Sequence, residues 1–126
     1  MAHILVIDHN KTSKSALKSL FAESHDVQTA STADEAIQHA SNQKPDIIVL
    51  ELSLAGHSGL EFLYEFRTYT DWWSVPVIIY TQIHLDQEVL KSRAWQQLNA
   101  VYMYKPSASL AQLKDMVEKV CHEVLS

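Results

Sequence analysis

The sequence predicts an α/β fold built on a five-stranded parallel sheet that helices cover on both faces. Several short, nearly continuous apolar runs have the pattern of strands that are buried on both sides, as in a parallel sheet. A helical apolar period separates these runs from one another. Because strand and helix patterns alternate along the chain, we expect βα units and therefore parallel strands.

The expected strands are HILVID at 3–8, DVQTA at 26–30, DIIVLEL at 46–52, PVIIYT at 76–81 and VYMY at 101–104. DVQTA is the weakest of these patterns, as is typical of an edge strand. Helical periodicity predicts helices around residues 16–21, 33–40, 60–64, 85–94 and 110–124. We expect Tyr64 on the apolar face of the third helix. Asp34 and Glu35 suit the start of the second helix, and Ser107 suits the start of the fifth.

Composition favours one soluble domain over residues 1–126 without an output domain. The chain has no internal repeat and no linker rich in Pro, Gly or Ser. Its formal net charge is -5 and its basic residues are scattered, which disfavours direct binding to nucleic acid. It has a single cysteine, Cys121, no charged-then-apolar leader, and no apolar run near the ~20 residues of a membrane span. We therefore expect a cytoplasmic protein with no membrane span.

Reactive side chains stand at the expected carboxyl ends of the strands. Asp8 and His9 end the first strand, Glu51 ends the third, Thr81 the fourth and Lys105 the fifth. In parallel sheets, ligands bind beyond these ends, where the strand order reverses. Two carboxylates, a hydroxyl and an ammonium group in one crevice indicate a phosphoryl-transfer or metal site.

Four segments, ILVID, PDIIVLEL, PVIIYT and YKP, carry a family resemblance. The chain resembles the receiver domain of two-component response regulators over essentially its whole length, and is similar to the single-domain chemotaxis type. The resemblance implies a flavodoxin-like (βα)5 fold with strand order 2-1-3-4-5. In this family an aspartate after the third strand accepts a phosphoryl group, and two acidic residues after the first strand hold Mg²⁺. A threonine and a lysine contact the phosphoryl oxygens, which implies these roles for Thr81 and Lys105.

Two positions depart from the family pattern. Glu51 stands at the phosphoacceptor position and His9 at the second acidic metal position. A glutamate extends its carboxylate about 1.5 Å further, into the space that the phosphoryl group needs. Imidazole removes a charge and an oxygen ligand of the kind that Mg²⁺ prefers. Ser53 stands where a backbone carbonyl usually completes the metal shell, so its side chain does not test that role.

We therefore expect an atypical receiver, or pseudo-receiver, that is not an enzyme and acts by binding other proteins. Glu51 either imitates the phosphorylated state or only keeps Lys105 paired, and the sequence leaves both interpretations open. We expect no cofactor. The alternative is a phosphorylatable single-domain regulator with Mg²⁺ at Asp8 and Glu51.

Two further functions receive less support from the sequence. Thr12, Ser13 and Ser15 offer hydroxyls to the phosphate of a flavin, although Asp8 would repel that phosphate. A transition metal would draw on histidines expected at the same end of the sheet, and these are His9, His57 and His84.

The resemblance places the partner surface on the fourth helix, fifth strand and fifth helix. Tyr102 occupies the position of an aromatic residue that turns inward on activation in the family. Trp95 and Tyr104 are candidate contacts for a histidine kinase, an effector or another signalling protein, with core packing as the alternative. Of the adjacent Trp72 and Trp73, we expect one to be buried and the other to be exposed as a candidate docking residue.

Overall fold

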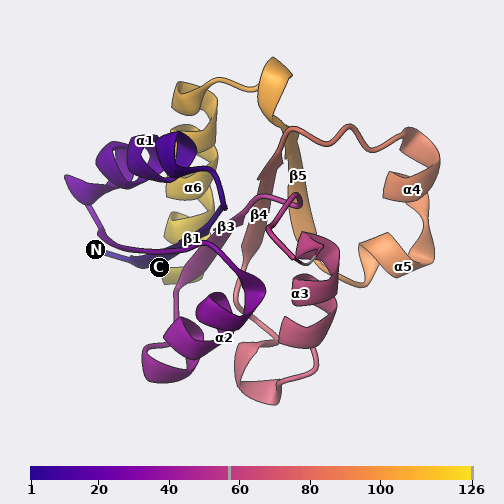
Figure 1. Cartoon of the computed structure of the whole chain (residues 1–126), viewed down its shortest axis with the longest axis horizontal. Coiled ribbons are helices and arrows are strands. Elements are labelled where there is room, and N and C mark those ends of the chain that lie inside the picture. Colours follow the sequence, from indigo (N-terminus) through magenta and orange to yellow (C-terminus); the bar gives the residue numbers. More distant parts are fainter. Residues whose placement is uncertain (57, 126) are drawn as a thin grey trace.

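Five parallel strands form one sheet through the middle of the computed structural model, which describes residues 1–56 and 58–125 (Figure 1). The strands are β1 His3–Ile7, β2 Asp26–Ala30, β3 Ile47–Leu50, β4 Val77–Thr81 and β5 Ala100–Tyr104. They lie in the order β2-β1-β3-β4-β5, and every neighbouring pair is parallel. This confirms the predicted fold class and strand order, and DVQTA is an edge strand as expected.

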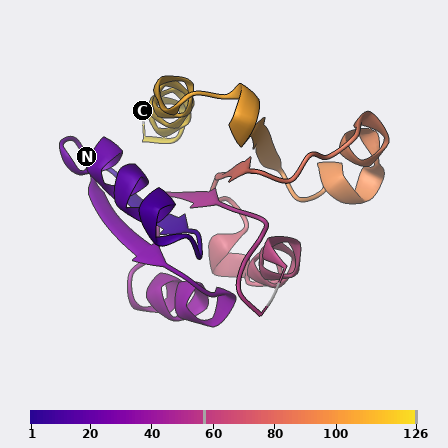
Figure 2. The same cartoon turned by 45° about the horizontal axis from the view of Figure 1, so that its top comes forward.

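Helices cover both faces of the sheet (Figure 2). The α-helices are α1 Lys11–Ala22, α2 Ala33–Asn42, α3 Gly59–Phe66, α4 Gln87–Lys91, α5 Arg93–Gln96 and α6 Leu110–Leu125, with short 3-10 turns η1 Thr70–Trp72 and η2 Lys105–Ser107. Helices α1 and α6 pack on one face, where Leu17, Phe21 and Val117 belong to a common core. Helices α2 and α3 pack on the other face, where Phe62 and Phe66 belong to a second core.

The two tryptophans before β4 divide as predicted. Trp72 is buried and stacks on Phe66, with 4.7 Å between the ring centroids. Trp73 is 61% exposed. Tyr64, in contrast, is exposed, so its predicted place on the apolar face was wrong. Phe62, Leu63 and Phe66 fill that face instead, because residues spaced by three and four share one side of a helix.

The predicted fourth helix is broken at Ser92, and the reason is a double cap. The Ser92 hydroxyl accepts the Trp95 N–H at 3.2 Å, which starts α5, and donates to the Val89 carbonyl at 2.6 Å, which ends α4. The break turns Trp95 into the core, where it is only 8% exposed. The prediction of Trp95 as a partner contact was therefore wrong.

The start of the last helix also differs from the prediction. Helix α6 begins at Leu110, and the Ser109 hydroxyl accepts the Gln112 N–H at 3.1 Å. Ser107 lies in the 3-10 turn before it. Ser107 and Ser109 are two similar candidate caps two residues apart, and only the path of the chain after Pro106 selects Ser109.

Candidate functional site

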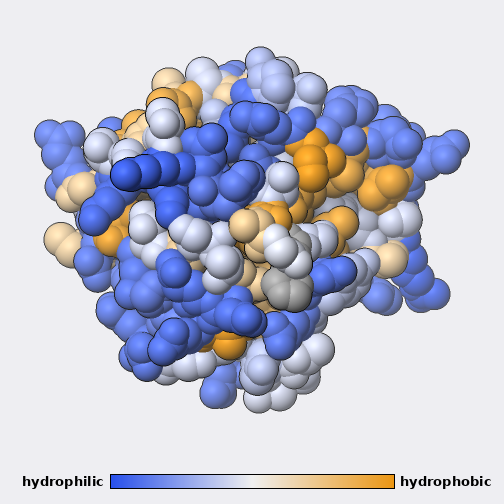
Figure 3. All heavy atoms as spheres, viewed as in Figure 1, coloured by the Kyte–Doolittle hydropathy of each residue, from blue (hydrophilic) through white to orange (hydrophobic). Residues whose placement is uncertain are grey.

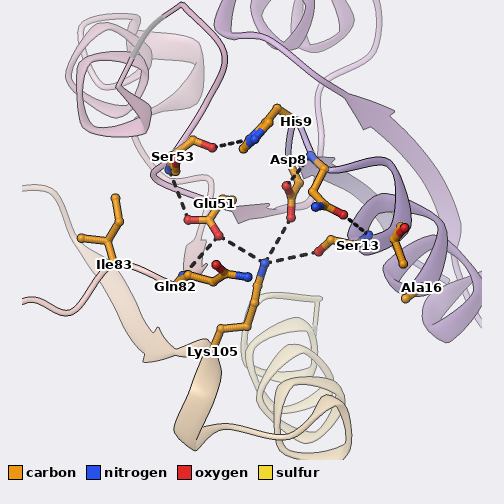
Figure 4. A pocket seen from close by; sticks show the side chains of 11 residues that line it. Asp8, His9, Ser13, Ala16, Glu51, Ser53, Gln82, Ile83 and Lys105 are labelled. Carbon is orange, nitrogen blue, oxygen red and sulfur yellow. Dashed lines mark hydrogen bonds and ion pairs between the residues drawn. The ribbon is translucent and has the colours of Figure 1, made fainter.

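An open cavity of about 590 Å³ lies beyond the carboxyl ends of the strands (Figure 4). It forms where the strand order reverses between β1 and β3, as expected for a ligand site in a parallel sheet. Its lining includes Asp8, His9, Ser13, Glu51, Ser53, Gln82 and Lys105. Thr81 lies just beneath, fully buried at the end of β4. The structure thus brings together the side chains that the sequence placed at the strand ends.

Glu51 follows β3 and is only 5% exposed. Its Oε1 accepts the Gln82 N–H and a hydrogen bond from Lys105 Nζ, both at 3.2 Å. Its Oε2 accepts the Ser53 N–H at 3.2 Å and the hydroxyl of Thr81. Four donors from three loops therefore converge on one carboxylate, and such charge-assisted bonds are the stronger kind.

Asp8 is buried at the end of β1, 2% exposed. Its Oδ1 accepts the Asn10 N–H at 2.9 Å and its Oδ2 accepts Lys105 Nζ at 3.2 Å. The Lys105 ammonium therefore bridges Asp8 and Glu51, and it also donates to the Ser13 hydroxyl at 3.2 Å. It lies 5.3 Å from the ring centroid of Tyr80. Burial raises the pKa of Tyr80, and the nearby Lys105 charge partly opposes that rise.

His9 turns toward the β3–α3 loop (Figure 4). Its Nδ1 lies 2.7 Å from the backbone carbonyl oxygen of Ser53. A carbonyl oxygen only accepts, so Nδ1 must carry the hydrogen in this contact. The imidazole therefore connects the loop after β1 to the loop after β3, at the carbonyl that the resemblance assigned to a metal shell.

The donors and acceptors of this pocket do not fit a Mg²⁺ site. Mg²⁺ requires an octahedron of oxygens, most of them free to turn toward the ion. Here His9 occupies the Ser53 carbonyl, and each carboxylate oxygen of Asp8 and Glu51 already accepts from a protein group. In the described part of the chain, every buried side-chain nitrogen and oxygen has a partner.

The residues also give no group of donors for a transition metal. Across residues 1–56 and 58–125, no three His, Cys, Asp or Glu side chains are placed to hold one ion. His84 is exposed and meets Tyr104 edge-on, with 5.2 Å between the ring centroids. His57 lies outside the described residues.

Hydrogen bonds continue from the pocket to Tyr102. The Thr81 hydroxyl accepts the Ile83 N–H at 3.0 Å, and the Tyr102 hydroxyl donates to the Ile83 carbonyl at 2.9 Å. The same phenol accepts the Leu85 N–H at 3.0 Å, and its ring meets Trp95 edge-on. Tyr104 is half-buried on the same strand. The β4–α4 loop is therefore fixed by Glu51 at one end and by Tyr102 at the other.

Two contributors to the site were absent from the sequence prediction. One is the backbone N–H of Gln82, and the other is the pairing of His9 with the Ser53 carbonyl. Every residue except proline has a backbone N–H, so the residue type does not predict which of these groups lines a site. The only available signal was position, since Gln82 directly follows the predicted contact residue Thr81.

The family model of the response regulator receiver domain matches residues 4–118. The chain therefore belongs to this family of signalling domains. Among curated relatives it is similar to Protein PilH of Pseudomonas aeruginosa, 27% identical over 84% of this chain and 87% of PilH. It is 30% identical to the KDP operon transcriptional regulatory protein KdpE of Escherichia coli over 63% of this chain. It matches the probable transcriptional regulator ycf29 of Cyanophora paradoxa at 29% identity over 70% of this chain.

These matches cover different shares of the relatives. The chain spans only 34% of KdpE and 42% of ycf29. That residues 1–126 lack an output domain therefore stays a prediction. No helix among the described residues is both long and apolar enough to cross a membrane.

Solved structures agree with the fold. A two-component response regulator from Clostridium difficile has a TM-score of 0.86 and 26% identity, with all of both chains covered. The chemotaxis protein CheY4 of Vibrio cholerae has a TM-score of 0.82 over 95% of this chain and 98% of CheY4. At 20% identity, that second likeness concerns the fold alone.

Proposed function

We propose that this chain is a pseudo-receiver, a signalling domain that binds a partner protein and is held in one state by Glu51 instead of by phosphorylation. One observation carries the proposal. The Glu51 carboxylate accepts at once from Thr81, from Lys105 and from the Gln82 N–H. Thr81 and Lys105 are the groups that the family resemblance assigns to the phosphoryl oxygens.

The same contacts argue against phosphoryl transfer to Glu51. An attacking carboxylate must approach phosphorus in line, with a cation left to neutralise the transferred group. Glu51 is buried and its oxygens are committed to four donors, while Lys105 is shared with Asp8. A phosphoryl donor would have to break these bonds before it reached the carboxylate.

The position of Tyr102 supports an active-like state over an inert remnant. Its hydroxyl is bonded to the Ile83 carbonyl and the Leu85 N–H, so the phenol is held against the β4–α4 loop. That loop is in turn held by Glu51 through Thr81 and Gln82. If Glu51 only kept Lys105 paired, it would need no bond to this loop.

We place the partner surface on α4, β5 and α6. Ile83, Val89 and Val101 are each at least 36% exposed there or beside it. In Figure 3, hydrophobic side chains gather between the end of β4 and α4. The partner is a histidine kinase, an effector or another signalling protein in the cytoplasm, with no direct contact to nucleic acid. With Trp95 in the core, the contact residues on this surface are these aliphatic side chains together with Tyr104.

Intact mass after incubation with acetyl phosphate tests the proposal, together with amide exchange at Ile83 and Leu85. The wild type should gain no phosphoryl mass, and both amides should be protected without any phosphodonor. Glu51→Ala should lose that protection, while Glu65→Ala, on the exposed side of α3, should retain it. A phosphoryl group found on Glu51 would instead establish the phosphorylatable regulator.

A further inference from the structure

The contact between His9 and Ser53 has a role beyond local packing. We propose that His9 is a positioning residue that closes the acidic pocket in place of a divalent cation, and that the domain is therefore insensitive to Mg²⁺. This inference deepens the proposed function and rests on it. If Glu51 holds the domain in one state without phosphorylation, the loops around Glu51 must also be held without a metal ion. We call the His9–Ser53 hydrogen bond the clasp.

The clasp acts on a backbone segment that Glu51 also holds. Ser53 donates its N–H to Glu51 Oε2 at 3.2 Å, and its carbonyl accepts from His9 Nδ1 at 2.7 Å. The N–H and the carbonyl of one residue are thus bonded to side chains from two different loops. Release of His9 would leave Ser53 held on one side only.

Further backbone contacts hold the segment around Ser53 in place. The Ser53 backbone bridges to Ser58, and the Gly59 N–H donates to the Leu52 carbonyl at 2.7 Å. A Cβ atom at Gly59 would lie 2.7 Å from the Leu52 Cα atom, so only glycine permits this approach. Because these contacts hold the backbone at Leu52 and Ser53, one hydrogen bond is sufficient to set the position of the Ser53 carbonyl.

The two carboxylates of the pocket are stabilised by groups of the chain itself, by one ammonium group and by neutral donors. Lys105 places one ammonium between the carboxylates of Asp8 and Glu51. The oxygens that do not face Lys105 accept backbone N–H groups from Asn10 and Ser53 and the Thr81 hydroxyl. A divalent ion would need the Ser53 carbonyl as well, and the His9 N–H points at that oxygen.

The clasp predicts that one substitution restores a metal site. His9→Asp removes the imidazole from the Ser53 carbonyl and adds a carboxylate beside Asp8, so that carbonyl and the new carboxylate become available to Mg²⁺. His84→Asp is the matched control, since it makes the same change in a loop at the same end of the sheet without contact to Ser53. His9→Asn is the conservative variant, because its amide N–H can still donate to the carbonyl.

Titration calorimetry with Mg²⁺, and with Mn²⁺ followed by its electron spin resonance, tests the clasp. Wild type, His9→Asn and His84→Asp should show no saturable binding over the titrated range, and His9→Asp should bind Mg²⁺ saturably, at least about tenfold more tightly than the detection limit that this range sets. Saturable binding by the wild type, or an equal gain in His84→Asp, would overturn the proposal. A folded His9→Asp variant that binds Mg²⁺ no better than the wild type would also overturn the proposal.

A second readout does not depend on the folding of a variant. The ¹⁵N spectrum of wild-type His9 should show the hydrogen on Nδ1, as donation to the Ser53 carbonyl demands. A neutral ring with its hydrogen on Nε2 alone would contradict the clasp.

Failure of the clasp is distinguishable from failure of the proposed function. A wild type that binds no Mg²⁺ yet gains phosphoryl mass would keep the clasp and refute the pseudo-receiver. A wild type that binds Mg²⁺ and gains no phosphoryl mass would refute the clasp and keep the pseudo-receiver.

Discussion

Two cationic side chains lie at opposite ends of the sheet and have opposite kinds of partner. Lys105, at the carboxyl ends of the strands, bridges the carboxylates of Asp8 and Glu51. Arg67, after α3, points its guanidinium at the other end of the sheet. Among the described residues it donates only to backbone carbonyls, those of Trp72, Trp73, Val75, Leu98 and Asn99, at 2.7–3.3 Å.

The difference separates a structural cation from a functional one. Carbonyls are neutral and permanent, so Arg67 ties three chain segments together in every state, and burial lowers its pKa without removing its charge. Carboxylates are charged side chains that chemistry or substitution can alter. The partners of Lys105, unlike those of Arg67, are therefore acidic side chains that a substitution can remove.

Arg67→Ala is the change that should destabilise the fold most. Five carbonyls would lose the guanidinium as a donor, including that of Asn99, whose φ of 52° lies in the left-handed region before β5. We expect the free energy of unfolding to fall by about 3 kcal/mol, measured by urea denaturation. The exposed Arg93→Ala, with the same loss of charge, should change it by less than about 0.5 kcal/mol. Equal losses of stability in Arg67→Ala and Arg93→Ala would show that the hydrogen bonds of Arg67 are not a structural support of the fold.

Lys105→Met should lower the free energy of unfolding less than Arg67→Ala does, although it removes an ammonium group from between two carboxylates. Water in the open pocket can take the place of the partly exposed ammonium, and Asp8 and Glu51 keep their other donors, so we expect a loss of about 1–2 kcal/mol. Adding Glu51→Gln should recover part of that loss, because one of the two facing charges is then gone. A double-mutant cycle in urea measures the recovery, and simple additivity would show that the two side chains are not coupled.

Tyr102→Phe should affect only the β4–α4 loop. Its hydroxyl is bonded to the Ile83 carbonyl and the Leu85 N–H, so its loss should accelerate exchange of the Leu85 amide about fivefold, which corresponds to about 1 kcal/mol. Tyr104→Phe retains the ring contact with His84 and should leave that amide unchanged. An acceleration spread over β1 and β3 would show that Tyr102 supports the whole fold instead.

The smallest expected effect concerns Cys121, which lies in the core apart from both cations. Burial, and then the charges of Glu118 and Asp46, raise the pKa of its thiol. The unfolded chain therefore loses this proton first, so the stability from Cys121 is complete below the ordinary thiol pKa of about 8.5 and declines as pH rises through the folded value. Cys121→Ala should flatten that alkaline decline in urea midpoints, and an unchanged slope would assign it to other groups.

Sequence reasoning was reliable where the pattern was long and failed where two local choices were nearly equal. The strands, their parallel direction and the division between Trp72 and Trp73 follow from apolar burial, which extends over whole segments, whereas the strand order was implied by the family resemblance. The helix at 85–94 was wrong because Ser92 can continue a helix or cap two, and neither glycine nor proline decides between them. The prediction of Trp95 as a partner contact was wrong for the same reason, since the helix break at Ser92 turns its ring into the core.

The sequence predicted which side chains lie in the pocket, but not which hydrogen bonds they make. Alternation of strands and helices brings the carboxyl ends of parallel strands to one edge, so the sequence alone placed Asp8, Glu51, Thr81 and Lys105 together. Whether His9 would meet a carboxylate or the Ser53 carbonyl depended on how two loops close against each other. So did the use of the Gln82 N–H, because backbone groups are identical in every residue except proline and only the tertiary structure decides which of them point into a site.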